Sequence, residues 1–117
     1  MERSFRRGDV LYMHLDPVEG SEQGGTRPVL VVSSDVLNEA LPVLTVAVIT
    51  SRKTERVFPS EVLVRAPEGG LRKDSKVLVH QLRTVAVSRV ERRMGGVRAD
   101  TLAAVMQALR IVFDMQD

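Results

Sequence analysis

Short runs of apolar, mostly β-branched residues recur along the chain, separated by polar turns. Runs of this kind are typical of core strands, and turn signals at "FP" (58–59) and "APEGG" (66–70) bound two of them. The pattern predicts strands at residues 9–15, 28–33, 43–50, 61–65 and 76–87. Many short strands interrupted by glycine and proline predict a mainly β fold, as a small barrel or a curled sheet.

Two other segments carry helix signals. The stretch "SSDVLNEAL" predicts one short helical turn, with Ser34 or Asp35 as its N-cap and Pro42 as its stop. From Asp100, a second predicted N-cap, apolar residues recur at helical spacing. They are Leu102, Val105, Met106, Leu109, Val112 and Phe113. We expect this stripe to lie against the sheet.

Length and composition favour one globular domain over residues 1–117. Hydrophobic residues make up 44% and charged residues 27%, which is typical of a folded chain and not of a disordered one. No apolar run approaches the roughly 18 residues that cross a membrane, and the start "MERSFRRGDV" lacks an apolar signal core. We therefore expect a cytoplasmic protein with no membrane partner.

The residue types present restrict the available chemistry. The absence of cysteine excludes disulfides, thiolate catalysis and cysteine zinc sites. His14 and His80 lie far apart, and neither stands in a metal-ligand spacing, so a packing or binding role is the simplest reading of each. We expect no metal and no cofactor, and catalysis that is metal-free or uses carboxylates.

The net charge of +2 is by itself a weak argument for a polyanionic partner. The placement of the positive charge is more informative, because adjacent cations punctuate the chain at residues 6–7, 52–53, 72–73 and 92–93. Any one of these pairs is most simply a solvated surface feature. The four pairs together favour an anionic partner more strongly.

The stretch "GSEQGGTRPVLVV" (20–32) holds one arginine at the start of an apolar run. Pro28 fixes its own φ and restricts Arg27 to extended geometry. A planar, permanently charged guanidinium held in this way suits a phosphate, to which it can donate two parallel hydrogen bonds. The adjacent glycines allow a close backbone approach to such a ligand.

A second candidate lies at the end of the run 43–50. Thr50 and Ser51 are followed by Arg52 and Lys53, so two hydroxyls and two cations emerge where the strand meets solvent. Hydroxyls at such a place commonly only terminate a strand. Sequential strands are usually neighbours, however, which would bring Thr50 close to Arg27.

These motifs together resemble the MazF/PemK family of toxin endoribonucleases. The resemblance rests on "RGDV" (7–10), "GSEQGGTRPVLV" (20–31), "IT" (49–50) and "QLRT" (81–84), in this order, and extends from Arg7 to Val112. It implies a compact SH3-like β-barrel with a C-terminal amphipathic helix. It also implies the toxin of a type II toxin–antitoxin pair, a homodimeric mRNA interferase that cleaves single-stranded RNA without a metal.

The resemblance also implies roles for particular residues. Arg27 and Thr50 match the family's catalytic arginine and threonine. Ser21, Glu22, Ser51 and Gln81 match positions near the family's RNA groove. Among the polar loop residues that would read bases are Glu22, Gln23, Arg52, Lys53, Gln81 and Arg83. His80 stands where some relatives carry an acidic residue, which bears on base preference.

The implied reaction is attack by the RNA 2′-hydroxyl, leaving a 2′,3′-cyclic phosphate and a 5′-hydroxyl. A guanidinium gives up its proton reluctantly, so Arg27 suits charge stabilisation, with proton transfer left open. The implied partner is a MazE-like antitoxin whose acidic, disordered tail folds along the basic groove. Two alternatives remain at this level: a CcdB-like toxin that poisons gyrase by protein binding, and an inactive nucleic-acid-binding barrel.

Overall fold

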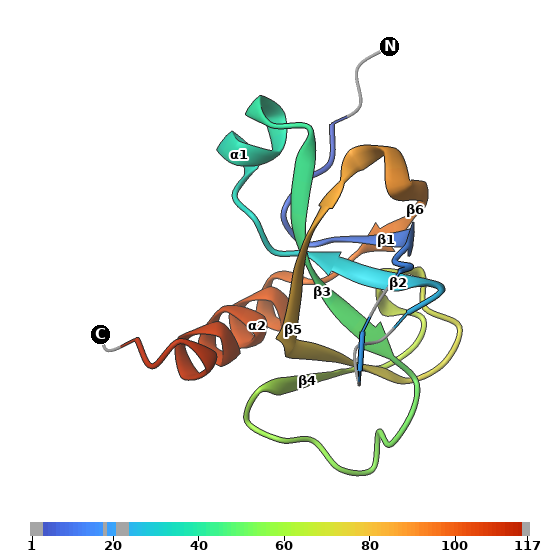
Figure 1. The fold of residues 1–117 in the computed structure, drawn as a ribbon. Coiled ribbons are helices and arrows are strands. Elements are labelled where there is room, and N and C mark those ends of the chain that lie inside the picture. Colours follow the sequence, from blue (N-terminus) through green and yellow to red (C-terminus); the bar gives the residue numbers. More distant parts are fainter. Residues whose placement is uncertain (1–3, 18, 21–23, 116–117) are drawn as a thin grey trace.

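The computed structural model describes residues 4–17, 19–20 and 24–115 of the chain. Over this part, six strands, two α-helices and two 3₁₀ turns follow one another (Figure 1). The strands are β1 (Asp9–His14), β2 (Thr26–Val31), β3 (Val43–Thr50), β4 (Glu61–Val64), β5 (Ser75–Ala86) and β6 (Val90–Gly96). The helices are α1 (Asp35–Ala40) and α2 (Ala99–Val112), and the 3₁₀ turns are η1 (Glu68–Gly70) and η2 (Val87–Arg89).

All six strands belong to one antiparallel sheet with the order β4-β5-β3-β2-β1-β6. The prediction of a mainly β fold with a C-terminal helix is confirmed. β4 and β6 are the edges of this sheet, and no hydrogen-bonded ladder joins them within the described residues. The curled sheet is thus an open barrel in its hydrogen bonding.

Each face of the sheet carries its own apolar cluster, because successive side chains of a strand point to opposite faces. Val10, Leu30 and Ala47 belong to one cluster, and their sequence neighbours Leu11, Val29 and Val48 belong to the other. α2 packs on β4 and β5 and covers the first cluster with Val105 and Ala108 (Figure 1). Burying both faces explains why the strands read as near-continuous apolar runs.

Five of the six strands lie where the apolar runs predict them, and β3 has the predicted bounds. The strand missed by the sequence is β6, "VERRMGG". Only Val90 and Met94 in it are apolar, and Arg92 and Arg93 are exposed. A strand at a sheet edge needs little apolar surface and commonly carries charge, so its pattern resembles a polar loop.

The start of one helix is confirmed and the start of the other is corrected. α1 has Ser34 as its N-cap, with the hydroxyl accepting from the Leu37 N–H at 3.4 Å. α2 begins at Ala99, not after Asp100: the N-cap is Arg98, whose N–H donates to the Glu68 carboxylate at 2.9 Å. Glu68, which is distant in the sequence, therefore accepts the hydrogen bond from the N-cap residue of this helix.

The predicted apolar stripe of α2 holds for most of its length, and Thr101 and Ala108 are buried beside it. Phe113 is the exception, with a relative exposure of 58%. It is the C-cap residue, and the end of the helix extends beyond the sheet in Figure 1. Phe113 has the helical spacing of the stripe, but no described residue covers its ring.

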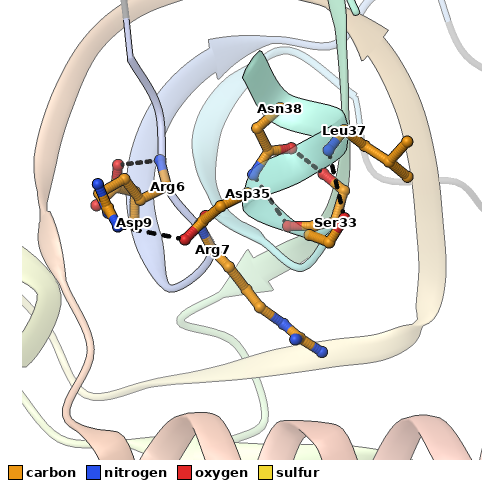
Figure 2. Close-up of polar contacts among 8 residues, drawn as sticks. Arg6, Arg7, Asp9, Ser33, Asp35, Leu37 and Asn38 are labelled. Atoms are coloured by element: carbon orange, nitrogen blue, oxygen red, sulfur yellow. Dashed lines mark hydrogen bonds and ion pairs between the residues drawn. The ribbon is translucent and has the colours of Figure 1, made fainter. Parts of the chain in front are cut away.

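Polar contacts fix α1 and the N-terminal turn to the sheet (Figure 2). The Arg7 N–H donates to the Asp35 carboxylate at 2.7 Å, and the Arg6 N–H donates to the Asp9 carboxylate at 2.8 Å. Asp9 is 6% exposed and also binds Arg93 of β6 at 3.0 Å. This buried carboxylate therefore joins the N-terminal turn to the edge strand.

A close backbone contact bridges part of the gap between the sheet edges. η1 lies against β6, where a Cβ atom on Gly70 would stand 2.2 Å from the Met94 carbonyl oxygen. Gly70 also has φ +73°, which side chains disfavour. Only glycine at this position allows η1 to approach β6 so closely.

Replacing Gly70 with alanine should therefore destabilise the fold by about 2–5 kcal/mol, the sum of left-handed strain and overpacking. Gly25→Ala is a matched control, because its φ of +76° is similar and nothing lies within 4 Å of the added Cβ. The control should lose about 1–2 kcal/mol from strain alone. Urea unfolding of both variants measures the difference, and equal losses would contradict the packing argument.

Candidate nucleic-acid interface

The pairing of β2 with β3 brings the two predicted catalytic residues to one place. These strands are antiparallel, with Val29 opposite Val48. Extending this register by two residues places Arg27 opposite Thr50. The beginning of β2 and the end of β3 therefore meet at the same end of the sheet.

A cavity of about 470 Å³ opens there, and both Arg27 and Thr50 line it. Its described lining contains five cationic side chains and neither a carboxylate nor an imidazole. The cations are Arg27, Arg52, Arg72, Lys73 and Arg92; the hydroxyls are Thr50, Ser51, Ser75 and Tyr12; the apolar residues are Pro28, Ile49, Leu71 and Met94. So many cations without a neutralising acid create a focused positive potential.

Arg27 is oriented by the loop that precedes it. Its Nε donates to the carbonyl oxygen of Gly24 at 2.9 Å. The loop is itself held by the Gly25 N–H, which donates to the Asp16 carboxylate at 2.9 Å. Because Nε is used in this way and the terminal nitrogens of the guanidinium form no hydrogen bond with a described residue, those two nitrogens suit a bidentate anion.

Thr50 is fixed as firmly. Its side chain lies in the buried part of the cavity wall, with a relative exposure of 7% for the residue. The hydroxyl oxygen accepts from the Arg52 N–H at 3.2 Å. A hydroxyl that accepts one bond keeps its own hydrogen for donation, so Thr50 can donate to an anion beside Arg27.

The β3–β4 loop, residues 51–60, carries Ser51 and Arg52 and is anchored by a buried ion pair. Lys76, the ladder partner of Thr50, binds Glu61 at 2.9 Å, with side-chain exposures of 6% and 7%. The ammonium also donates to the Arg56 carbonyl at 2.8 Å. One lysine thus connects the loop to the strand that supports Thr50.

The Glu61 carboxyl is kept ionised by this arrangement. Burial alone would raise its pKa, but the hydrogen bonds from the Phe58 N–H and from Lys76 outweigh burial. The charges of Lys76 and, last, of His80 act in the same direction. The pKa of Glu61 therefore lies below its ordinary value of 4.5.

The remaining predicted RNA-contacting residues are placed differently. Ser51 and Arg52 line the cavity, whereas Lys53, Gln81 and Arg83 do not. Arg83 lies opposite Val46, four positions along β3 from Thr50, and donates to the Leu15 carbonyl at 2.6 Å. Ser21, Glu22 and Gln23 lie outside the described residues.

The two histidines do not reach this lining. His14 contacts the Thr26 hydroxyl at 3.0 Å, and His80 contacts the Ser60 hydroxyl at 3.2 Å. Within residues 4–17, 19–20 and 24–115, no group of three or more acidic or histidine side chains could hold a metal ion. No helix in the same ranges is both long and apolar enough to cross a membrane.

Several lining residues had no assigned role in the sequence. The Arg72-Lys73 and Arg92-Arg93 pairs were recognised as charge clusters, and the structure brings Arg72, Lys73 and Arg92 to the cavity. Tyr12 stands within an apolar run, and together with three phenylalanines it is one of few aromatic residues, so the sequence offered little support for a platform on which bases stack. Its ladder partner is Arg92, whose guanidinium carbon lies 4.9 Å from the centre of the Tyr12 ring.

A small curled sheet with a cationic cavity at its end, and no acid in the described lining of that cavity, suits a polyanionic ligand. The chain belongs to the family described as the PemK-like, MazF-like toxin of type II toxin–antitoxin systems, whose family model matches residues 6–113. The family resemblance drawn from the sequence motifs is therefore confirmed.

Relatives match this chain over almost its whole length. Endoribonuclease EndoA of Bacillus subtilis (strain 168) is 37% identical over 112 residues, covering 96% of this chain and 97% of the relative. The crystal structure of MazF (Form-I) from Deinococcus radiodurans is 29% identical, with a TM-score of 0.83 over 97% of this chain and 100% of that one. The MazE-MazF (Form-II) structure from the same organism is 29% identical, with a TM-score of 0.77 over 98% and 100%.

The buried Lys76–Glu61 pair predicts an acid-dependent loss of stability. Because the folded pKa of Glu61 is depressed, its contribution is complete above the unfolded value near 4.5 and disappears as pH falls through the folded pKa. Glu61→Gln should cost about 3–5 kcal/mol at pH 7, since Lys76 is left buried and unpaired. Urea unfolding at pH 7 and at descending pH should show the gap between wild type and variant narrowing below pH 4.5.

Two further variants serve as controls for this prediction. Arg65→Gln removes an exposed pair with Asp74 and should cost less than about 1 kcal/mol. Glu61→Gln combined with Lys76→Met should regain much of the loss, because no buried charge remains unpaired. A gap between wild type and Glu61→Gln that stays constant with pH would contradict the role of the carboxylate.

Proposed function

We propose that this chain is a sequence-specific endoribonuclease, the toxin of a type II toxin–antitoxin pair, which cleaves single-stranded RNA without a metal ion. The single observation that carries this proposal is the cavity that unites Arg27 and Thr50 with four further cations and no carboxylate in its described lining. Family membership supports the same activity, as does similarity to a relative named an endoribonuclease. The catalytic assignment to Arg27 and Thr50 is part of the proposal.

In the proposed reaction, the 2′-oxygen of the RNA attacks the adjacent phosphorus, and the bond from phosphorus to the 5′-oxygen breaks. The 2′-hydroxyl loses its proton and the leaving 5′-oxygen gains one, both by exchange with water. The products are a 2′,3′-cyclic phosphate and a 5′-hydroxyl end. DNA has no 2′-hydroxyl, so it would bind in the cavity and remain whole.

Arg27 stabilises the charge that develops on the phosphorane, which is usually the largest contribution a preorganised site makes. Its orientation by Gly24 matters because a donor fixed before the reaction need not reorganise during it. Thr50 donates its hydroxyl hydrogen to a non-bridging phosphate oxygen, and its bond from the Arg52 N–H sets the direction of that donation. Arg52, Arg72 and Lys73 hold the neighbouring phosphates.

The same proposal includes the partners and the place of action. The similar Form-II structure from Deinococcus radiodurans is one of MazE-MazF, and an antitoxin of the MazE kind would inhibit the present chain by laying an acidic segment over the cations of the cavity. We propose a homodimer of one toxin domain per chain, acting on RNA in the cytoplasm. Ser21, Glu22, Gln23, Lys53, Gln81 and Arg83 remain proposed contacts for the RNA beyond the cavity.

The direct test is cleavage of a long single-stranded RNA in EDTA, with analysis of the ends and a DNA control. The wild type should cut at a recurring short motif and leave cyclic phosphates. Arg27→Ala should lower kcat by about 100-fold to 1,000-fold, as removal of a preorganised donor does. Arg27→Lys should recover little, because a lysine keeps the charge and loses the bidentate geometry.

Thr50 offers a matched pair of variants in the same assay. Thr50→Ser keeps the hydroxyl and should retain most activity, whereas Thr50→Val keeps the volume and should lose it. Circular dichroism establishes that each variant is folded. Intact RNA with a folded wild type would overturn the proposal and favour a protein target such as gyrase.

The cluster of cations predicts strong salt dependence of RNA binding. Removing Arg72 and Lys73 together should lower the slope of log K against log salt by about 1.4, the value for two phosphate contacts on a single strand. Arg110→Gln is the control, because Arg110 is exposed on α2 and does not line the cavity. Fluorescence anisotropy of a labelled oligonucleotide measures both slopes, and equal slopes would show that residues 72–73 contact no phosphate.

A further inference from the structure

Tyr12 lines the cavity, and it is the one tyrosine in a chain that contains no tryptophan. The phenylalanines are placed elsewhere. Phe58 and Phe113 are exposed outside the cavity lining, and Phe5 packs on the cluster that contains Leu11. The described cavity lining therefore has one aromatic ring, partly buried in the middle of β1.

This ring belongs to a row of side chains that crosses four strands. Tyr12 of β1 is the ladder partner of Arg92 on one side and of Pro28 on the other. The register between β2 and β3 then places Ile49 beyond Pro28. All four residues line the cavity, and Leu71 and Met94 add apolar surface to the same lining.

The row and the proposed catalytic pair line the same cavity. Arg27 precedes Pro28 and Thr50 follows Ile49, and successive side chains of a strand point to opposite faces, so it is the shared lining at the end of the sheet, and not adjacency in the sequence, that joins them. Pro28, Ile49, Leu71 and Met94 form an apolar floor of the cavity. Apolar side chains cannot bind a phosphate, which the cations of the lining bind instead. A flat, weakly polar group attached to that phosphate is the part of the substrate that this floor fits.

Tyr12 and Arg92 add flat surfaces on which a base can stack, which the apolar floor lacks. The Arg92 guanidinium stands over the Tyr12 ring at 4.9 Å from its centre, which is cation–π geometry. Aromatic rings and arginine planes are the two surfaces on which proteins stack the bases of single-stranded RNA. Here both belong to one pair, in one wall of one cavity.

We propose that a nucleobase next to the scissile phosphate leaves the stack of its strand and packs in this cavity against the Tyr12–Arg92 pair. The inference rests on the proposed function and adds to it a base subsite that neither Arg27 nor Thr50 provides. Stacking tolerates any base, because each has a π-face. The subsite therefore fixes the position of the nucleotide, while base identity is read by other groups.

The single tyrosine makes the subsite directly observable, because the tyrosine emission of the protein comes from Tyr12 alone. Titration with an uncleavable DNA oligonucleotide of the cleavage-site sequence should quench this emission in step with binding, measured by anisotropy. Free tyrosine amide in the same solutions corrects for light absorbed by the bases. Oligonucleotides with one abasic position each should all bind, and one of them should bind without quenching.

Variants test the same subsite through RNA cleavage. Tyr12→Leu should raise KM about tenfold, the loss of one stacked base, with kcat changed much less. Tyr12→Phe keeps the ring and should raise KM far less than Tyr12→Leu does. Arg92→Gln should also raise KM, and Arg110→Gln should not. Thermal unfolding establishes that Tyr12→Leu is folded.

The outcomes separate this inference from the function on which it rests. Tight binding without quenching, quenching that survives every abasic substitution, or an equal loss in Tyr12→Phe and Tyr12→Leu would overturn the base subsite while RNA cleavage by the wild type stands. An absence of RNA cleavage by folded wild type would instead overturn the proposed function, and the subsite with it.

Discussion

The site depends on the register between β2 and β3. Val29 faces Val48 in this pairing, and the same register sets Arg27 across from Thr50. A slip of one residue would turn the apolar side chains of a whole strand to the opposite face. The two apolar clusters on the two faces of the sheet penalise such a slip. The packing of the core therefore also fixes the backbone positions of Arg27 and Thr50 relative to each other.

Acidic side chains are used to hold the structure around the cavity and are kept out of its described lining. Asp16 binds the loop that carries Arg27, Glu61 binds Lys76 beneath the β3–β4 loop, and Asp9 joins the N-terminal turn to β6. Each carboxylate accepts its hydrogen bonds away from the cations of the cavity. The positive potential there is thus preserved by the placement of the acids as much as by the number of cations.

The sequence predicted the features of the fold and the site that depend on residues close together in the chain. It missed those that depend on contacts between distant residues. The bounds of β3 and the candidates Arg27 and Thr50 followed from apolar runs, a proline and a glycine loop, which act within a few residues. β6 was missed because an edge strand has no need of an alternating apolar pattern. The N-cap of α2 was misplaced because Glu68, distant in the chain, binds the Arg98 N–H. Tyr12 and Arg92 meet only through the β1–β6 register, which no local pattern encodes.

The seam between the edge strands β4 and β6 makes one part of the cavity wall more easily deformed than the rest. The sheet has no ladder at this joint among the described residues, and η1 rests against β6 through the contact of Gly70 with Met94. Leu71 on one side of the seam and Met94 on the other are both walls of the cavity. Van der Waals contacts yield to small displacements more readily than a row of hydrogen bonds does. The wall of the cavity at this seam is therefore held less stiffly than the paired strands that carry Arg27 and Thr50.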